Sequence, residues 1–136
     1  MAAHNELGKD GEQLAVQYLI EKGFDIREQN WRFQKAEVDI IAQKGAVLAI
    51  VEVKTRSNSF FGDPQEFVKK DKINLLTKAI DHYVREFDLD VEVRFDIIGI
   101  VKTDFKTSIT HSRILKLLEI YFLYVNSVQR GSCFAY

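Results

Sequence analysis

Three charged side chains, Asp39, Glu52 and Lys54, are of the types that together hydrolyse phosphodiesters, and they lie in or beside apolar segments. A hard cation such as Mg²⁺ binds oxygen ligands and is usually held by one or two carboxylates plus water. Asp39 and Glu52 could supply two of these ligands. The carbonyl of Val53, between Glu52 and Lys54, could supply a third.

A lysine beside such a cation could help to activate the attacking water and to stabilise the transition state. The cation would lower the pKa of its bound water and neutralise charge that grows on a phosphoryl group. Lys54 could orient or deprotonate that water, and its positive charge could stabilise the pentavalent transition state. The pattern is therefore that of a phosphodiesterase in outline, although an acid followed by Glu-x-Lys also occurs by chance.

The segments that carry these residues predict a β-hairpin. Val38–Ala42 and Val47–Val53 are rich in Val and Ile, and Gln43–Ala46 between them contains a glycine. Side chains alternate faces along a strand, so Glu37 and Asp39 share one face, as do the two charges of the second strand.

The length of the loop decides whether those faces coincide. A loop of two or four residues would put all four charged groups on one face, whereas three or five would separate them. We expect the first arrangement, in which Ala42 lies opposite Val47, Asp39 opposite Ile50, and Glu37 opposite Glu52. The facing glutamates would repel each other, and a cation or the side chain of Lys54 would relieve that repulsion.

Length and composition are those of an ordinary globular domain. The chain has 136 residues, of which 46% are hydrophobic and 29% charged, and its net charge is −1. A nucleic-acid partner would therefore need a local basic patch. The single cysteine, Cys133, excludes a disulfide framework and a cysteine-based zinc site. With no apolar signal region at the N-terminus, we expect a cytoplasmic protein.

Hydrophobic spacing predicts the elements around the hairpin. Asn5 is expected as the N-cap of the first helix and Gly23 as its C-terminal stop, and Asp63-Pro64 and Asp71 as start signals of the second helix. The predicted order is helix Asn5–Gly23, strand Phe24–Phe33, the hairpin, a helix from Asp71 to Phe87, strand Val91–Val101 and a short strand Thr107–His111. This order predicts an α/β or α+β domain with a mixed sheet covered by helices.

Two segments could contact nucleic acid. The segment Thr55–Gly62 is expected to be a polar loop, in which Arg56 could contact phosphate and Phe60 or Phe61 could stack on a base. The start of the second helix has a surplus of lysines that includes Lys72. Both features are more often plain surface, a loop with an apolar anchor and a solvated helix face.

Several motifs together resemble the signature of the bacterial YraN family. That family is similar to restriction-endonuclease-like nucleases and archaeal Holliday-junction resolvases, and the match runs from about Gly8 to His111. The matching motifs are Gly11-Glu12, Asn30-Trp31-Arg32, Ala36–Ala42, Val51–Arg56, Phe61–Pro64, Lys72 and Arg94-Phe95-Asp96.

The resemblance implies an αβββαβ core and a PD-(D/E)xK-type site. Asp39 and Glu52 would hold Mg²⁺ or Mn²⁺, and Lys54 would be the catalytic lysine. In resolvase-like relatives a glutamate of the first helix also approaches the metal, which assigns Glu12 that role. Glu37 would be an accessory acid.

The chain departs from the family pattern in two places. Ala36 replaces the usual glycine, which affects only the local backbone. The restriction-endonuclease-like domain is expected over residues 1–111, and a divergent apolar tail, expected to be helical, over residues 112–136. The tail is too short to span a membrane, and it could be a buried helix, a dimer contact or a poorly packed end.

The leading hypothesis is a metal-dependent endonuclease acting on branched or otherwise structured DNA. A non-catalytic module that keeps the fold and binds nucleic acid or protein is the alternative, favoured by the mild overall charge. A plain structural protein with solvated hairpin charges is a third. Resolvase activity would require a homodimer with two sites.

Overall fold

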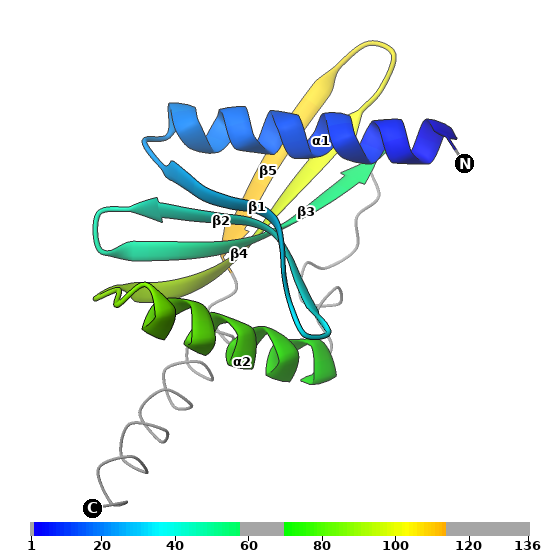
Figure 1. Ribbon diagram of the computed structural model, residues 1–136. Coiled ribbons are helices and arrows are strands. Elements are labelled where there is room, and N and C mark those ends of the chain that lie inside the picture. Colours follow the sequence, from blue (N-terminus) through cyan, green and yellow to red (C-terminus); the bar gives the residue numbers. More distant parts are fainter. Residues whose placement is uncertain (1, 58–69, 114–136) are drawn as a thin grey trace, which may run out of the picture.

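A computed structural model describes residues 2–57 and 70–113 of the chain (Figure 1). Within these residues the chain forms two helices and five strands. They are α1 (Ala2–Glu21), β1 (Asp25–Phe33), β2 (Ala36–Lys44), β3 (Val47–Arg56), α2 (Lys70–Glu86), β4 (Glu92–Lys102) and β5 (Thr107–Arg113). No helix in this part of the chain is both long and apolar enough to cross a membrane.

The strands form one mixed sheet in the order β1-β2-β3-β4-β5. The pairs β1–β2, β2–β3 and β4–β5 are antiparallel, whereas β3 and β4 are parallel and are joined through α2. The predicted α/β class with a mixed sheet and flanking helices is confirmed. The order of elements agrees with the αβββαβ core that the family resemblance implied, followed by one further strand.

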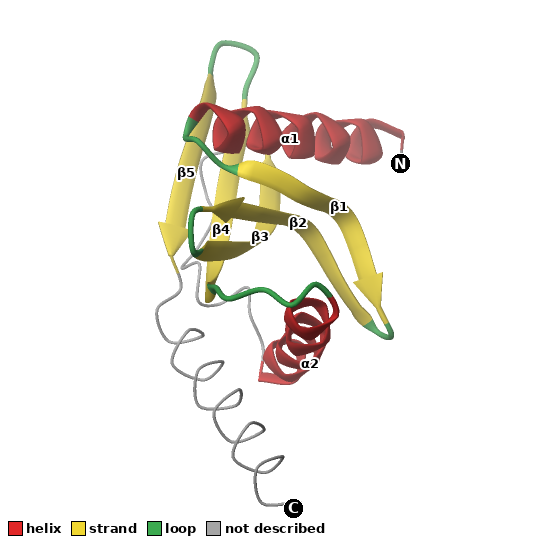
Figure 2. Ribbon diagram, turned by 60° about the vertical axis from the view of Figure 1, so that its left-hand side comes forward, coloured by secondary structure: helices red, strands yellow, loops and turns green. Residues whose placement is uncertain are grey.

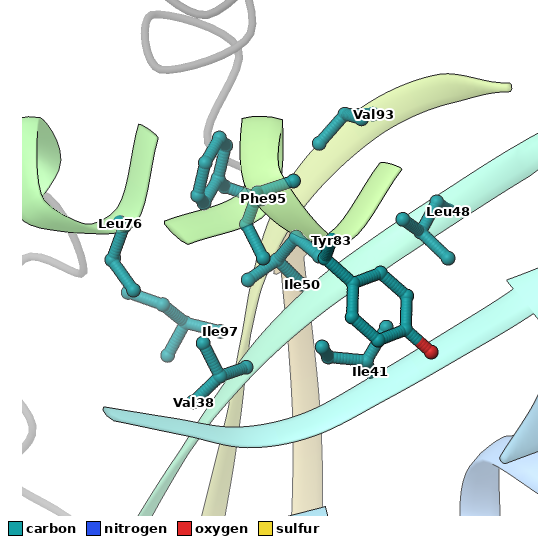
Figure 3. Packing of buried hydrophobic residues seen from close by; sticks show 10 residues of the cluster. Val38, Ile41, Leu48, Ile50, Leu76, Tyr83, Val93, Phe95 and Ile97 are labelled. Carbon is teal, nitrogen blue, oxygen red and sulfur yellow. The ribbon is translucent and has the colours of Figure 1, made fainter. Parts of the chain in front are cut away.

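The two helices cover opposite faces of the sheet (Figure 2). Against α1 pack Ile40 and Ala42 of β2, Ala49 and Val51 of β3, and Ile98 and Ile100 of β4. Against α2, through Leu76, Ile80 and Tyr83, pack Val38, Ile41, Leu48, Ile50, Val93, Phe95 and Ile97 (Figure 3). Strands buried on both faces read as continuous apolar runs, which explains the Val- and Ile-rich segments.

The first helix begins earlier than predicted and ends where predicted. It starts at Ala2, so Asn5 lies within the helix and is not its N-cap. At the other end, Gly23 has φ +92° and its N–H donates to the carbonyl of Ile20, while the N–H of Phe24 donates to the carbonyl of Leu19. This is a Schellman-type ending, in which glycine is favoured because φ is positive.

The other predicted elements lie within a few residues of the observed ones. The strands β1, β4 and β5 agree with the predictions, and α2 starts next to the Asp71 signal and ends at Glu86. Arg56 is the last residue of β3, so the prediction that it belongs to a loop is wrong. The Asp63-Pro64 signal, Phe60 and Phe61 lie outside the described residues. So does the predicted tail, apart from Ser112 and Arg113, which end β5.

The hairpin loop has two residues, but the predicted pairing is wrong by two positions along the strand. Gly45 and Ala46 form the turn, with Gly45 at φ +59°, and Lys44 pairs with Val47. Ala42 therefore lies opposite Ala49 rather than Val47. The predicted opposition of Glu37 and Glu52 does not occur, because the β2–β3 ladder ends at Ile40 and Val51; Glu37 instead forms an ion pair with Arg32 of β1.

Candidate functional site

The site lies where β2 and β3 stop pairing. Their ladder ends at Ile40 and Val51, and beyond it the β1–β2 hairpin bends away from β3 (Figure 2). Asp39, the next residue of β2, crosses the opening with its side chain, and its Oδ2 accepts a hydrogen bond of 2.8 Å from the N–H of Val53. The carboxylate of Asp39 thus accepts the hydrogen bond that a backbone carbonyl of β2 would accept if the ladder continued.

An open cavity of about 600 Å³ occupies this end of the sheet. Its walls come from β2, β3, the first half of α1, the start of α2, the β1–β2 turn and the part of β4 that contains Asp96. They include eight residues that the sequence assigned to metal, catalysis or phosphate contact: Glu12, Glu37, Asp39, Glu52, Val53, Lys54, Arg56 and Lys72. The structure therefore brings these eight residues to one cavity, although they differ in how they are engaged.

Glu52 is held by two lysines. Lys54 Nζ lies 3.2 Å from Glu52 Oε1 and Lys72 Nζ lies 2.5 Å from the same oxygen. The Glu52 side chain is only 19% exposed, so both contacts lie in a partly desolvated setting. Lys54 reaches Glu52 because residues two apart on a strand share a face, whereas Lys72 comes from the first turn of α2.

Asp39 has a different environment. It is half-buried, and its pKa is raised above the usual value, chiefly because burial disfavours the charged carboxylate. The hydrogen bond from Val53 and the positive charge of Lys72 act in the opposite direction, while the negative charges of Glu12 and Glu52 raise the pKa further. Glu12 and Glu52 thus both disfavour the charged form of Asp39, and the positive charge of Lys72, which pairs with Glu52, opposes them more weakly.

Glu12 reaches the site because α1 approaches β3 very closely. A Cβ placed on Gly11 would lie 1.9 Å from Thr55 Oγ1 and 3.0 Å from Thr55 Cβ. Only glycine allows this contact, since real Cβ atoms do not approach other heavy atoms so closely. Gly11 therefore sets the distance between helix and strand, and the next residue, Glu12, faces the cavity that Asp39 lines.

The accessory positions are less enclosed. Glu37 lines the cavity but is exposed, and its Oε1 lies 3.4 Å from Arg32. Arg56 is also exposed at the rim, and its Nη1 donates to the carbonyl of Thr55. Because the N–H and C=O of one strand residue point to the same strand edge, the carbonyl of Val53 faces the opening on the β2 side.

The donor set has the chemistry that a hard divalent cation requires. The oxygens of Asp39 and Glu52 with the carbonyl of Val53 match the ligands that Mg²⁺ prefers, and the like charges around Asp39 would be relieved by a cation. In residues 2–57 and 70–113, however, no three His, Cys, Asp or Glu side chains already converge as a metal-holding group.

The sequence did not predict a second polar cluster, which lies beneath α1. Arg94 contacts both carboxylate oxygens of Asp96 at 2.9 and 2.8 Å, and His111 Nε2 lies 2.6 Å from Asp96 Oδ2. Tyr18 lies 3.1 Å from His111 Nδ1. A signal was present, because Arg94 and Asp96 stand two apart on one face of an otherwise apolar strand. Tyr18 and His111, however, are distant in the sequence.

Comparison with known proteins places this geometry in a family. A family model described as Uncharacterised protein family UPF0102 matches residues 11–100. The chain belongs to this family. The matched residues hold Gly11, Asp39, Glu52 and Lys54, and the resemblance to YraN proteins that the sequence motifs indicated is confirmed.

Relatives in several bacteria share most of the chain. A UPF0102 protein of Christiangramia forsetii is 60% identical over 111 residues, covering 82% of this chain and 93% of the relative. One from Flavobacterium johnsoniae is 50% identical over 115 residues, covering 82% and 94%, and one from Bacteroides thetaiotaomicron is 50% identical over 111 residues, covering 82% and 92%. These three UPF0102 relatives are therefore matched over nearly their full length.

Proposed function

We propose that this UPF0102 protein is a metal-dependent endonuclease that hydrolyses phosphodiester bonds in DNA of branched or otherwise structured form, in the cytoplasm. The observation that carries the proposal is the arrangement of Asp39, Glu52 and Lys54 at the point where β2 and β3 separate. Two carboxylates from neighbouring strands and a lysine on the face of one of them meet at a single open cavity.

Asp39, Glu52 and the carbonyl of Val53 would hold Mg²⁺ or Mn²⁺. When bound, such a cation neutralises charge that grows on a phosphate and makes water more acidic. Glu12 faces the same cavity and adds negative charge that would strengthen the attraction for a cation. This use of Glu12 agrees with the role that the family resemblance implied.

The two lysines supply positive charge beside the scissile phosphate. Lys54 Nζ can orient or deprotonate the attacking water, or stabilise the charge that grows on the phosphate oxygens. Lys72, from α2, contacts the same oxygen of Glu52 as Lys54 does and helps to fix the orientation of the carboxylate. Arg56 at the rim is placed to contact a neighbouring phosphate of the backbone.

A cleavage assay tests the proposal directly. Linear duplex, single-stranded and four-way-junction DNA are incubated with wild-type protein and Mn²⁺ or Mg²⁺, and with Glu52→Gln. We expect cleavage by the wild type that falls at least about 100-fold in Glu52→Gln, as is usual when a principal electrostatic group is removed. Glu86→Gln, an exposed glutamate at the end of α2 that pairs with His82, is the matched control. Equal cleavage by wild type and Glu52→Gln would overturn the site assignment.

A second candidate is a non-catalytic module that binds nucleic acid or protein. It is favoured by one observation, that Glu52 is already neutralised by Lys54 and Lys72. This candidate predicts DNA binding that weakens with salt, is unchanged by Mg²⁺, and occurs without cleavage. If the DNA is a four-way junction, the nuclease proposal also requires a homodimer, which sedimentation with the junction would reveal.

A further inference from the structure

A second cavity, which we name the basic cavity, is lined by cationic side chains at the other end of α1. It is open, has a volume of about 320 Å³, and is formed by α1 and the segment after it, the start of β3, and β2, β4 and β5. Its polar lining residues are Tyr18, Lys22, Lys44, Arg94, His111 and Arg113. None of these residues lines the cavity that holds Asp39 and Glu52.

The charge of the basic cavity is strongly positive. Lys22, Lys44 and Arg113 are exposed at its rim, and Arg94 lies deeper, with its side chain 11% exposed. The carboxylate of Asp96 is buried behind the wall, where it neutralises Arg94 and also contacts His111. The four cations therefore leave an excess of about three positive charges facing one opening, in a chain whose net charge is −1.

The hydrogen-bond donors are held in place by the structure. Lys44 Nζ donates to the carbonyl of Lys22 at 2.7 Å, which ties strand β2 to the end of α1. Lys22 Nζ lies 5.6 Å from the centre of the Tyr18 ring, and Arg94 Cζ lies 5.8 Å from that of Phe24. Such stacking limits the motion of the long side chains, so less conformational entropy is lost when they bind a ligand.

The Tyr18 hydroxyl is also positioned by a buried chain of contacts. The carboxylate of Asp96, which is bound by Arg94, can only accept hydrogen bonds. Nε2 of His111, which lies 2.6 Å from Asp96, therefore carries the hydrogen of the ring. His111 Nδ1 then faces the Tyr18 hydroxyl at 3.1 Å. The chain runs from the buried carboxylate to the cavity wall and fixes a polar oxygen among four cations.

From these observations we propose that the basic cavity binds a phosphate group carried by a small molecule of about nucleotide size. A dianionic phosphate monoester matches the excess positive charge, and Lys and Arg are the side chains that bind phosphate oxygens. The volume lies at the lower end of the range for small-molecule sites, which is about 300–1,000 Å³. Phe24 supplies an apolar wall for the rest of the molecule. The proposal does not rest on nuclease activity.

Calorimetric titration with inorganic phosphate and with a nucleoside 5′-monophosphate tests the proposal. We expect saturable binding to wild-type protein that weakens about tenfold or more when Lys22→Gln and Arg113→Gln are combined, because two charged contacts are lost. Both residues are exposed, so the fold should persist. Lys102→Gln, which removes a half-exposed lysine from the opposite end of β4, is the matched control and should bind like the wild type.

The two ligands distinguish the source of the phosphate. Equal affinities would assign the site to free phosphate, whereas tighter binding of the monophosphate would assign it to a phosphorylated nucleoside, and both results support the site. Nuclear magnetic resonance should show the ring signals of Tyr18 and His111 shifting with saturation. Absence of saturable binding by both ligands, or an equal loss in Lys102→Gln, would overturn the proposal.

Discussion

Asp39 and Asp96 lie on strands of the same sheet, but the protein holds their carboxylates in opposite ways. Asp96 is fully buried and is contacted by Arg94 and His111. Asp39 is only half-buried, accepts a backbone hydrogen bond from Val53, and has its pKa raised by Glu12 and Glu52 and lowered more weakly by Lys72. Asp96 is thus paired with a cation within the fold, whereas no ion pair of Asp39 occurs among residues 2–57 and 70–113.

The difference indicates which carboxylate is available to a ligand. A buried charge without a partner is costly, so proteins normally pair it or expose it. Asp96 follows this rule, and its carboxylate serves the structure. Asp39 departs from it at an open cavity beside Glu52, where a raised pKa and like charges would be relieved by a bound cation.

The largest effect on stability is expected from Asp96→Asn. The change would leave the guanidinium of Arg94 buried without its counter-charge, and breaking such a pair typically costs about 3–5 kcal/mol. Denaturant unfolding of wild type and variant would measure the loss. If the free energy of unfolding changed by less than about 1 kcal/mol, Asp96 would not be the structural carboxylate that the comparison requires.

A smaller loss is expected from Gly11→Ala. The new methyl group would collide with Thr55, and overpacking of this kind costs about 1–3 kcal/mol. Gly8→Ala is a matched control in the same helix, because a Cβ there meets nothing within 4 Å. That control should gain up to about 1 kcal/mol from helix propensity. Equal gains in both variants would show that α1 does not need glycine to approach β3.

In contrast to the two previous variants, Asp39→Asn is expected to increase the free energy of unfolding. The pKa of Asp39 is raised in the folded protein, so the folded state binds a proton more readily than the unfolded state, and wild-type stability falls as pH rises from about 3.8 through the folded pKa. The variant lacks this loss and should be more stable than wild type at neutral pH. The advantage should vanish below pH 3.8. Unfolding curves across that range would contradict the account if the variant were less stable at pH 7.

The sequence predicted the helices, the strands and the residues that line the candidate site better than it predicted the register between β2 and β3. Strand and helix positions follow from local hydrophobic spacing, and Gly23 from the need for positive φ at a helix end. The register of β2 against β3 depends on the two-residue turn at Gly45-Ala46, which composition alone did not select. Asp39 and Glu52 nevertheless line one cavity, because they lie directly beyond the last paired residues, Ile40 and Val51, at the same end of the hairpin.

The full cluster around Asp96 could not be predicted from the sequence, because its members are far apart in the chain. Its members come from α1, β4 and β5, and Tyr18 and His111 are 93 residues apart in the chain. Only the tertiary fold brings them together. The close contact of Gly11 with Thr55 is equally long-range, so the position of Glu12 at the site rested on the family resemblance and not on spacing.

Calorimetric titration of Mg²⁺ and Mn²⁺ tests the central claim, that Asp39 and Glu52 form a cation site, most directly. Wild-type protein is compared with the combined Asp39→Asn and Glu52→Gln variant, and with Asp81→Asn and Glu86→Gln, which alter charges on α2 away from the cavity. We predict saturable binding by wild type and by the α2 variant, and its loss from the site variant. Equal binding by all three, or none by wild type, would contradict the account.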